Sequence, residues 1–246
     1  MLFCYNKNAD YMEIVLLLII TILPIAILSL FIYDMDNEKE SLKLLGKLLV
    51  SGVLACLIVC FISRILLEMI PSFRINPMEM NILTLLLFSF MGVSLVEEGS
   101  KLFFLYMASY EEKEFDYTFD MIVYAVFVSL GFALLENGLY IFQYGFLTGV
   151  SRAFTAVPAH ASYGVFMGMF LSKAKCYEVK NPLKSKLYKI LSLVVPLVIH
   201  GLYDVFAFKN ELGYLARFII LLFASTVMFI QKKKKDDIKI SLYSIE

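Results

Sequence analysis

The chain has 246 residues, equal numbers of basic and acidic side chains, and 60% hydrophobic residues. Its mean hydropathy of +0.78 is higher than the core of a soluble domain of this size would require. The formal net charge is zero, so nothing in the charge balance favours a polyanion, and we expect no nucleic-acid partner. The composition therefore predicts a protein integral to the lipid bilayer.

Apolar runs long enough to cross a membrane occur throughout the chain, since a spanning helix needs about 20 such residues. Short charged connections separate them, and no soluble domain or flexible linker is apparent, so we expect one membrane domain over residues 1–246. Backbone polar groups in lipid must be satisfied within their own segment, which predicts an all-α polytopic transmembrane helical bundle of about seven spans. The seven runs are residues 12–33, 44–66, 82–108, 119–144, 152–172, 187–208 and 213–231.

The distribution of lysine and arginine predicts the orientation of this bundle. Seven spans place the connections at 34–43, 109–118 and 173–186 on the same side as the C-terminus. Most lysines lie on that side, including the run Lys232–Lys235. Because basic loops stay in the cytoplasm, we expect a cytoplasmic C-terminus and an N-terminus outside.

The third run carries Glu97, Glu98 and Lys101. Lys101 lies one helical turn from both glutamates, so it can neutralise one carboxylate. The other carboxylate is then available as a general base that activates water. A buried ion pair that fixes the helix register would need only one glutamate, and two adjacent glutamates exceed that need.

The fourth run carries Glu136, Asn137 and Tyr140. Glu136 and Tyr140 share a helix face, so the phenol can hydrogen-bond to the carboxylate, whereas Asn137 points about 100° away. A polar network around Glu136 and a direct catalytic role are both compatible with this pattern.

The last two polar runs carry the only histidines of the chain. His160 continues a face made by Gly164 and Gly168, which lets another helix approach closely. His200 and Asp204 are four residues apart on one face, so the carboxylate can orient the ring, or both side chains can bind a metal. A histidine packed in the core and a structural His–Asp pair are the alternatives. Ionisable groups at membrane depth are costly, which makes all of them functional candidates.

Four motifs in this order resemble the PrsW family of intramembrane proteases. They are Glu97-Glu98-x-x-Lys101, Glu136-Asn137, His160 and His200-x-x-x-Asp204. The resemblance covers residues 85–208, and we expect a protease-like core at 82–208. The family is similar to a wider group that contains the CAAX prenyl endopeptidases and bacteriocin-processing proteins. Lys101 and Asp204 stand where those relatives carry Arg and Asn, which argues against prenylated substrates.

The resemblance implies a multi-pass protease of the bacterial plasma membrane. It would make the first cut in a single-pass membrane protein such as an anti-sigma factor. By position, Glu97 would be the general base, supported by Glu98 and Lys101. His160 would share the water, while His200 and Asp204 would complete the catalytic set. Glu136, Asn137 and Tyr140 would support it.

The resemblance implies either a metal-free or a metal-dependent mechanism. Without metal, Asp204 would hold His200, which donates to the oxyanion. With metal, zinc would be bound by Glu97, His160 and His200. The built-in lysine and the absence of a paired-histidine zinc motif favour the metal-free mechanism, so we assign no cofactor and keep zinc as the alternative.

Two other functions fit a helical bundle with buried charges. A non-catalytic immunity or scaffold protein would retain the fold without the activity, but every expected polar position is filled here. An ion or proton transporter would spread its ionisable groups through both leaflets. Here most of them are expected in the outer half of the bilayer, which favours a single hydrolytic site.

Overall fold

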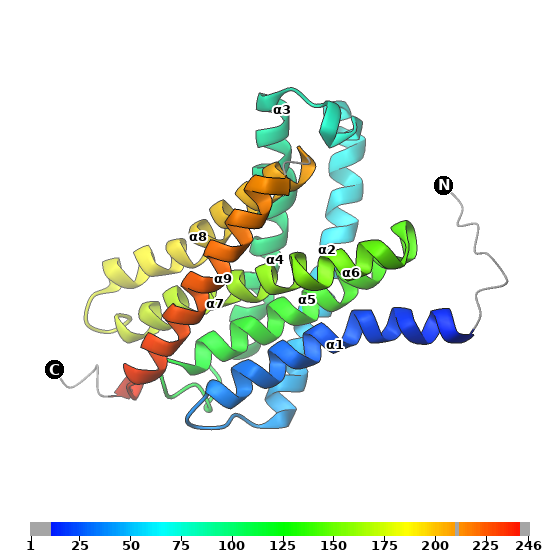
Figure 1. Ribbon diagram of the computed structural model, residues 1–246. Coiled ribbons are helices and arrows are strands. Elements are labelled where there is room, and N and C mark those ends of the chain that lie inside the picture. The colour runs from blue at the N-terminus through cyan, green and yellow to red at the C-terminus, as the bar shows by residue number, and fades with distance from the viewer. Residues whose placement is uncertain (1–10, 210–211, 242–246) are drawn as a thin grey trace.

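The structure is a computed structural model that describes residues 11–209 and 212–241. Among these residues it is all-helical apart from one isolated bridge between Tyr117 and Lys239 (Figure 1). The predicted all-α fold is confirmed. The elements are α1 (Tyr11–Met35), α2 (Leu42–Met69), η1 (Pro71–Arg74), η2 (Pro77–Glu79), α3 (Ile82–Leu87), η3 (Phe88–Ser94), α4 (Leu95–Ser109), α5 (Asp120–Tyr144), α6 (Phe146–Phe154), α7 (Ala156–Cys176), α8 (Pro182–Phe208) and α9 (Leu212–Lys235).

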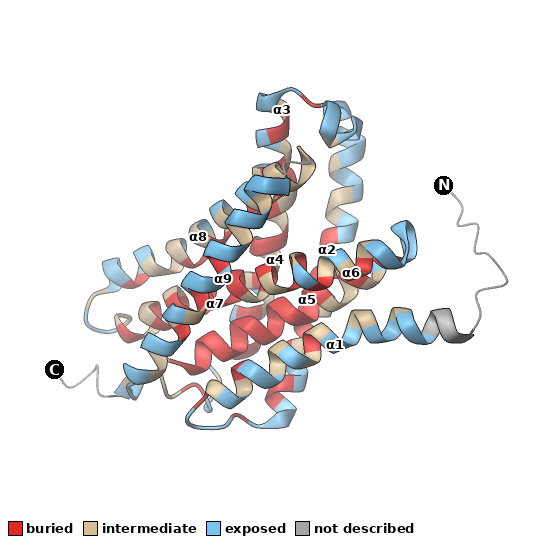
Figure 2. Ribbon diagram, in the orientation of Figure 1, coloured by how far each residue is buried: buried red, intermediate tan, exposed pale blue. Residues whose placement is uncertain are grey.

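Six helices among the described residues are long and apolar enough to span a membrane. They are α1, α2, the continuous run from α3 to α4, α5, α8 and α9. The helix α7 has 21 residues and lies inside the bundle, so the expectation of about seven spans is consistent with the structure. Large apolar side chains are exposed on the outer faces of α1, α2 and α8, as lipid contact requires (Figure 2).

The boundary of the fifth predicted span is wrong. The structure does not form one helix over 152–172 but ends α6 at Phe154 and begins α7 at Ala156. Thr155 between them has φ −119° and ψ −73°. Pro158 follows in the first turn of α7, where the missing N–H is tolerated, whereas a proline in the middle of a longer helix would break a hydrogen bond. Arg152 therefore belongs to a separate short helix.

The helix α5 is the centre of the bundle and is buried along most of its length (Figure 2). It packs between α2 and α7 through glycines on its neighbours. A Cβ on Gly52 would lie 2.0 Å from the carbonyl oxygen of Val128, and one on Gly168 would lie 2.3 Å from that of Met121. The close approach expected at the small-residue face of residues 160–168 is therefore confirmed, and its partner helix is α5.

Hydrogen bonds hold the loops together at each end of the bundle. At one end, Ser41 donates to the Glu114 carboxylate, and the Thr118 N–H donates to the Ile238 carbonyl. At the other end, the Lys209 ammonium donates to the Met80 carbonyl. The connections expected on the side of the C-terminus thus lie at one end. The N-terminal residues 1–10, for which we expect a position outside the cell, lie outside the described residues.

Candidate active site

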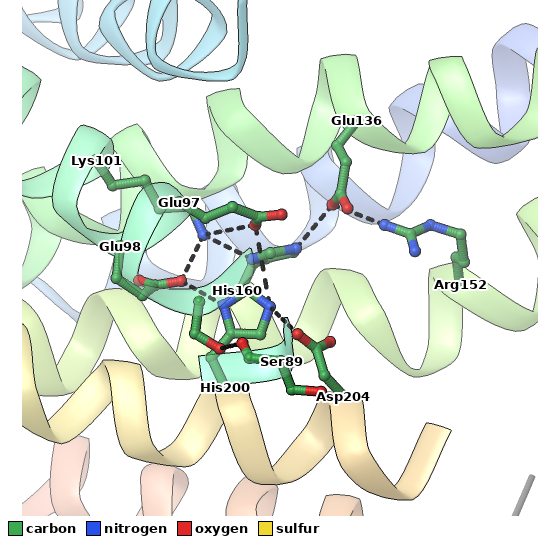
Figure 3. Close-up of polar contacts among 10 residues, drawn as sticks. Ser89, Glu97, Glu98, Lys101, Glu136, Arg152, His160, His200 and Asp204 are labelled. Carbon is green, nitrogen blue, oxygen red and sulfur yellow. Dashed lines mark hydrogen bonds and ion pairs between the residues drawn. The ribbon is translucent and has the colours of Figure 1, made fainter. Parts of the chain in front are cut away.

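Charged side chains from five helices meet inside the bundle (Figure 3). The segment before α4 is π-helical over Phe88–Ser94, and such segments often occur at functional sites. Gly201 lets this segment approach α8, because a Cβ there would lie 2.7 Å from the Phe90 ring. The approach brings α4 and α8 together beside His200. The cluster consists of Glu97, Glu98 and Lys101 from α4, Glu136 from α5, Arg152 from α6, His160 from α7, and His200 and Asp204 from α8.

Lys101 is the hub of the cluster and is fully buried. Its Nζ lies 2.7 Å from Glu98 Oε1 but 3.8 Å from Glu97 Oε2. Of the two carboxylates, the structure therefore joins Glu98 to the lysine. The ammonium also lies 4.2 Å from the centre of the Phe132 ring, a cation–π contact.

The contacts of His160 define its tautomer. Lys101 Nζ lies 2.9 Å from Nδ1, and Glu136 Oε2 lies 2.8 Å from Nε2. An ammonium can only donate, so Nδ1 accepts and the ring proton lies on Nε2, which donates to Glu136. Both ring nitrogens are thus engaged. His160 is positioned as a link between Lys101 and Glu136.

The carboxylate that orients His200 is Glu98, and not Asp204 as expected. Glu98 Oε1 lies 2.8 Å from His200 Nδ1, a hydrogen bond. Asp204 Oδ2 lies 3.6 Å from Nε2, beyond hydrogen-bond distance. The reason is that Glu98 projects from α4 against the ring, while Asp204 shares the helix of His200. His200 Nε2 therefore faces Asp204 and also Glu97 Oε2, at 3.9 Å.

Arg152 completes the cluster, although the sequence analysis gave it no role. Its Nη2 lies 2.7 Å from Glu136 Oε2, and its guanidinium carbon lies 3.8 Å from the centre of the Tyr140 ring. Tyr140 therefore packs against the arginine, and this contact takes the place of the expected hydrogen bond from the Tyr140 phenol to the Glu136 carboxylate. Asn137 is buried, but within the described part of the chain its side-chain atoms have no hydrogen-bond partner, and the structure does not join it to the cluster. The only sequence signal for Arg152 is that an arginine stands beside an apolar run.

Three buried carboxylate oxygen atoms at the centre lack hydrogen-bond partners among the described residues: Glu97 Oε2, Glu98 Oε2 and Asp204 Oδ2. Those of Glu97 and Asp204 face His200 Nε2. Two carboxylates and one imidazole are a donor set that zinc accepts. The ligand atoms that lie within 4.8 Å of one another are those of Glu97, Glu98 and His200, and those of Glu97, Glu136 and His160, so Glu97 with either histidine fits a catalytic metal. These two groups divide the predicted metal set of Glu97, His160 and His200 between them. Glu97 Oε2 and His200 Nε2 could equally hold a water molecule.

Charge balance supports the presence of a ligand or extra protons at this site. Four carboxyl groups face two permanent cations, and isolated charges are costly to bury. The carboxyl groups are those of Glu97, Glu98, Glu136 and Asp204, and the cations are Lys101 and Arg152. The side chains of Glu136 and Arg152 are each 15% exposed, so the cluster is most open on their side.

Comparison with known proteins identifies the family of this chain. Residues 40–230 match the model of a family described as PrsW family intramembrane metalloprotease. The chain is 35% identical to Protease PrsW of Geobacillus kaustophilus over 77% of this chain and 79% of the relative. It is 33% identical to Protease PrsW of Clostridioides difficile, covering 76% and 77%.

Protease PrsW of Oceanobacillus iheyensis is 31% identical and covers more of both chains, 88% of this one and 95% of the relative. No solved structure shows significant similarity. The family match spans the helices that carry every charged residue of the cluster. The chain therefore belongs to the PrsW family of intramembrane proteases.

Proposed function

We propose that the protein is an endopeptidase that hydrolyses a peptide bond in a single-pass membrane protein, with Glu97 accepting the proton of the attacking water. The observation that carries this assignment is the difference between the two adjacent glutamates. Glu98 is bound to Lys101 and His200. Glu97 Oε2 is buried and has no hydrogen-bond partner within residues 11–209 and 212–241. Glu98 Oε2 lacks a partner as well, but Glu98 is held through Oε1, so Glu97 is the carboxylate that is free to take a proton.

The proposed reaction uses groups that already face one another. Glu97 takes a proton from water as its oxygen bonds to the carbonyl carbon of the peptide. Three carboxylates lie within 3.9 Å of His200 and favour its protonated form, whose Nε2–H can donate to the developing oxyanion. The protonated Glu97 then gives its proton to the leaving amine as the carbon–nitrogen bond breaks.

The family description makes a metal the alternative to this scheme. Glu97 and His200 would hold zinc, which when bound supplies a Lewis acid and lowers the pKa of a bound water. Lys101 and Glu98 would keep their roles, because Lys101 donates to Glu98, and Glu98 holds His200 Nδ1 and leaves Nε2 directed at the site.

We propose an anti-sigma factor as the substrate and the first cut as the reaction, as the family resemblance implies. The test is co-expression of the protein with tagged single-pass membrane proteins encoded in the same genome, including its anti-sigma factors. We expect a shortened product from the wild type and none from Glu97→Gln. If abundant wild-type protein cleaves none of these membrane proteins, the proposed substrate class is refuted.

We further propose that the end of the bundle with the C-terminal helix terminus faces the cytoplasm. Four lysines end α9, and Lys173 and Lys175 end α7. Cysteines placed at the exposed positions Lys180 and Lys235, in a protein without native cysteines, should resist an impermeant thiol reagent in intact cells. Labelling of both positions from outside would invert this orientation.

A further inference from the structure

A second group of buried acids lies far from the active site, at the opposite end of α5. Asp36 and Glu40 belong to the segment between α1 and α2, and Asp120 is the first residue of α5. One carboxylate oxygen from each lies within 4.8 Å of the other two. Sixteen residues of α5 separate Asp120 from Glu136, a distance of about 24 Å along the helix. The group is therefore separate from the active site.

The carboxylates of this group are buried and make few hydrogen bonds. Asp36, Glu40 and Asp120 are 3%, 6% and 1% exposed. Asp120 Oδ2 accepts hydrogen bonds from the backbone N–H groups of Asp116 and Tyr117. Its Oδ1 and both oxygens of Asp36 have no hydrogen-bond partner of standard geometry among the described residues. Buried carboxylates this close require a balancing charge or shared protons.

The nearest lysine does not neutralise the group by hydrogen bonding to it. Lys39 Nζ instead donates to the backbone carbonyls of Tyr33, Asp34 and Asp36. An independent observation comes from α5. Tyr124 lies one turn after Asp120, is fully buried, and its hydroxyl has no hydrogen-bond partner of standard geometry in the described ranges. This hydroxyl lies close to the Glu40 carboxyl group, so a fourth oxygen adjoins the acids.

We propose that Asp36, Glu40 and Asp120 form a second site, which binds a hard divalent cation, Mg²⁺ or Ca²⁺. All the available donors are oxygen atoms, which these two ions prefer, whereas softer metals select nitrogen or sulfur. Both ions commonly complete their coordination with water, so three carboxylates are a sufficient protein contribution. The cation supplies the positive charge that the surrounding side chains lack.

The position of the site gives the cation a structural role. The segment that carries Asp36 and Glu40 is followed by Ser41, which is held by Glu114. The turn before Asp120 is joined to the tail, because Thr118 donates to Asp237. One ion at the three acids would tie the α1–α2 connection to α5 beside that junction. Its loss should loosen this end of the bundle.

The test uses the full chain in detergent after treatment with chelator. Mg²⁺ and Ca²⁺ are titrated separately, and bound ion and Tm are measured for the wild type, Asp36→Asn and the control Glu38→Gln. Glu38 is an exposed carboxylate in the same segment. We expect the wild type and the control to bind one ion and to show a Tm that rises with its concentration. Asp36→Asn should lose both effects, and the ion active at the lower concentration is the preferred one.

Retention of binding and of the Tm rise in Asp36→Asn would place the ion elsewhere and overturn the proposal. Absence of any effect of millimolar Mg²⁺ or Ca²⁺ on the wild type would also overturn it, and would show that the acids share protons. If Asp36→Asn does not fold, Tyr124→Phe provides the second measurement. It removes one oxygen at the edge of the site and should weaken cation binding, whereas unchanged affinity would contradict the site described here.

Discussion

Replacing Glu97 by glutamine removes a charge at the centre of the active site and keeps the shape of the side chain. The ionic contacts that are lost, to Lys101 at 3.8 Å and to His200 at 3.9 Å, both lie beyond hydrogen-bond distance. Lys101 keeps its shorter contacts to Glu98 and His160. We therefore expect the free energy of unfolding to change by less than about 1 kcal/mol.

The effect on activity should be much larger. General-base catalysis contributes roughly 100- to 10,000-fold to the rate. Because a tenfold change in rate is about 1.4 kcal/mol, the Glu97→Gln variant should lose about 3–5 kcal/mol of transition-state stabilisation. Cleavage should fall by at least about 100-fold at normal abundance of the protein in the membrane.

Glu98→Gln should behave in the opposite way. It removes the negative charge from the carboxylate that lies 2.7 Å from Lys101 and 2.8 Å from His200, all of them buried groups. Removing one partner of such a buried pair costs about 3–5 kcal/mol, so this variant should lose thermal stability and abundance.

The assay compares product formation in membranes with the Tm of purified protein for both variants and the exposed control Glu79→Gln. Wild-type cleavage by Glu97→Gln would remove Glu97 from the mechanism. An equal loss of Tm in both variants would refute the distinction between a free and an anchored glutamate.

Three further predictions test the packing, the donor set and the second acidic group. Gly52→Ala should lower the Tm, because its Cβ would overlap the α5 backbone at a cost of about 1–3 kcal/mol or more. Gly46→Ala on the same helix should leave the Tm unchanged, because a Cβ there meets no atom of a neighbouring element within 4 Å among the described residues. Equal Tm values for the two variants would refute the close helix contact. Zinc added to chelator-treated protein should bind to His160→Ala but not to His200→Ala, because both ring nitrogens of His160 already make hydrogen bonds. Elemental analysis measures the bound zinc, and the reverse pattern would refute His200 as the zinc ligand. Burial and a neighbouring carboxylate raise the pKa of Glu40 from its ordinary value of 4.5 to about 9, so the native chain holds a proton that the unfolded chain releases. In chelator, the free energy of unfolding should therefore fall as the pH rises from about 5 to 9, and a Tm independent of pH would contradict this.

The sequence predicted the helical bundle because lipid leaves few alternatives. A run of about 20 apolar residues in a membrane must be helical, and helical spacing then determines which side chains share a face. For this reason the contact between Glu98 and Lys101 could be anticipated within α4. The close approach at Gly168 could be anticipated as well, since a residue without a side chain on an apolar helix marks a contact.

Contacts between helices could not be predicted in the same way, because they depend on how the helices rotate and end. Helical spacing favoured Asp204 as the partner of His200, yet Glu98 from another helix takes that place. The break at Thr155 moved Arg152 out of the fifth span and toward Glu136. The sequence contains each of these residues, but periodicity within one helix carries no information on which partner from another helix is nearer.

The protonation state of His200 connects the metal question to the charge balance of the site. His160 accepts a hydrogen bond from Lys101 and therefore stays neutral, so it cannot offset the excess of carboxylates. A bound zinc would add two positive charges, and it would need the lone pair of His200 Nε2, which requires a neutral ring. Without zinc, a protonated His200 supplies one of these charges, and a further proton on a carboxyl group must supply the other. Zinc binding and a protonated His200 are therefore mutually exclusive, so bound zinc should abolish the imidazolium form of this ring.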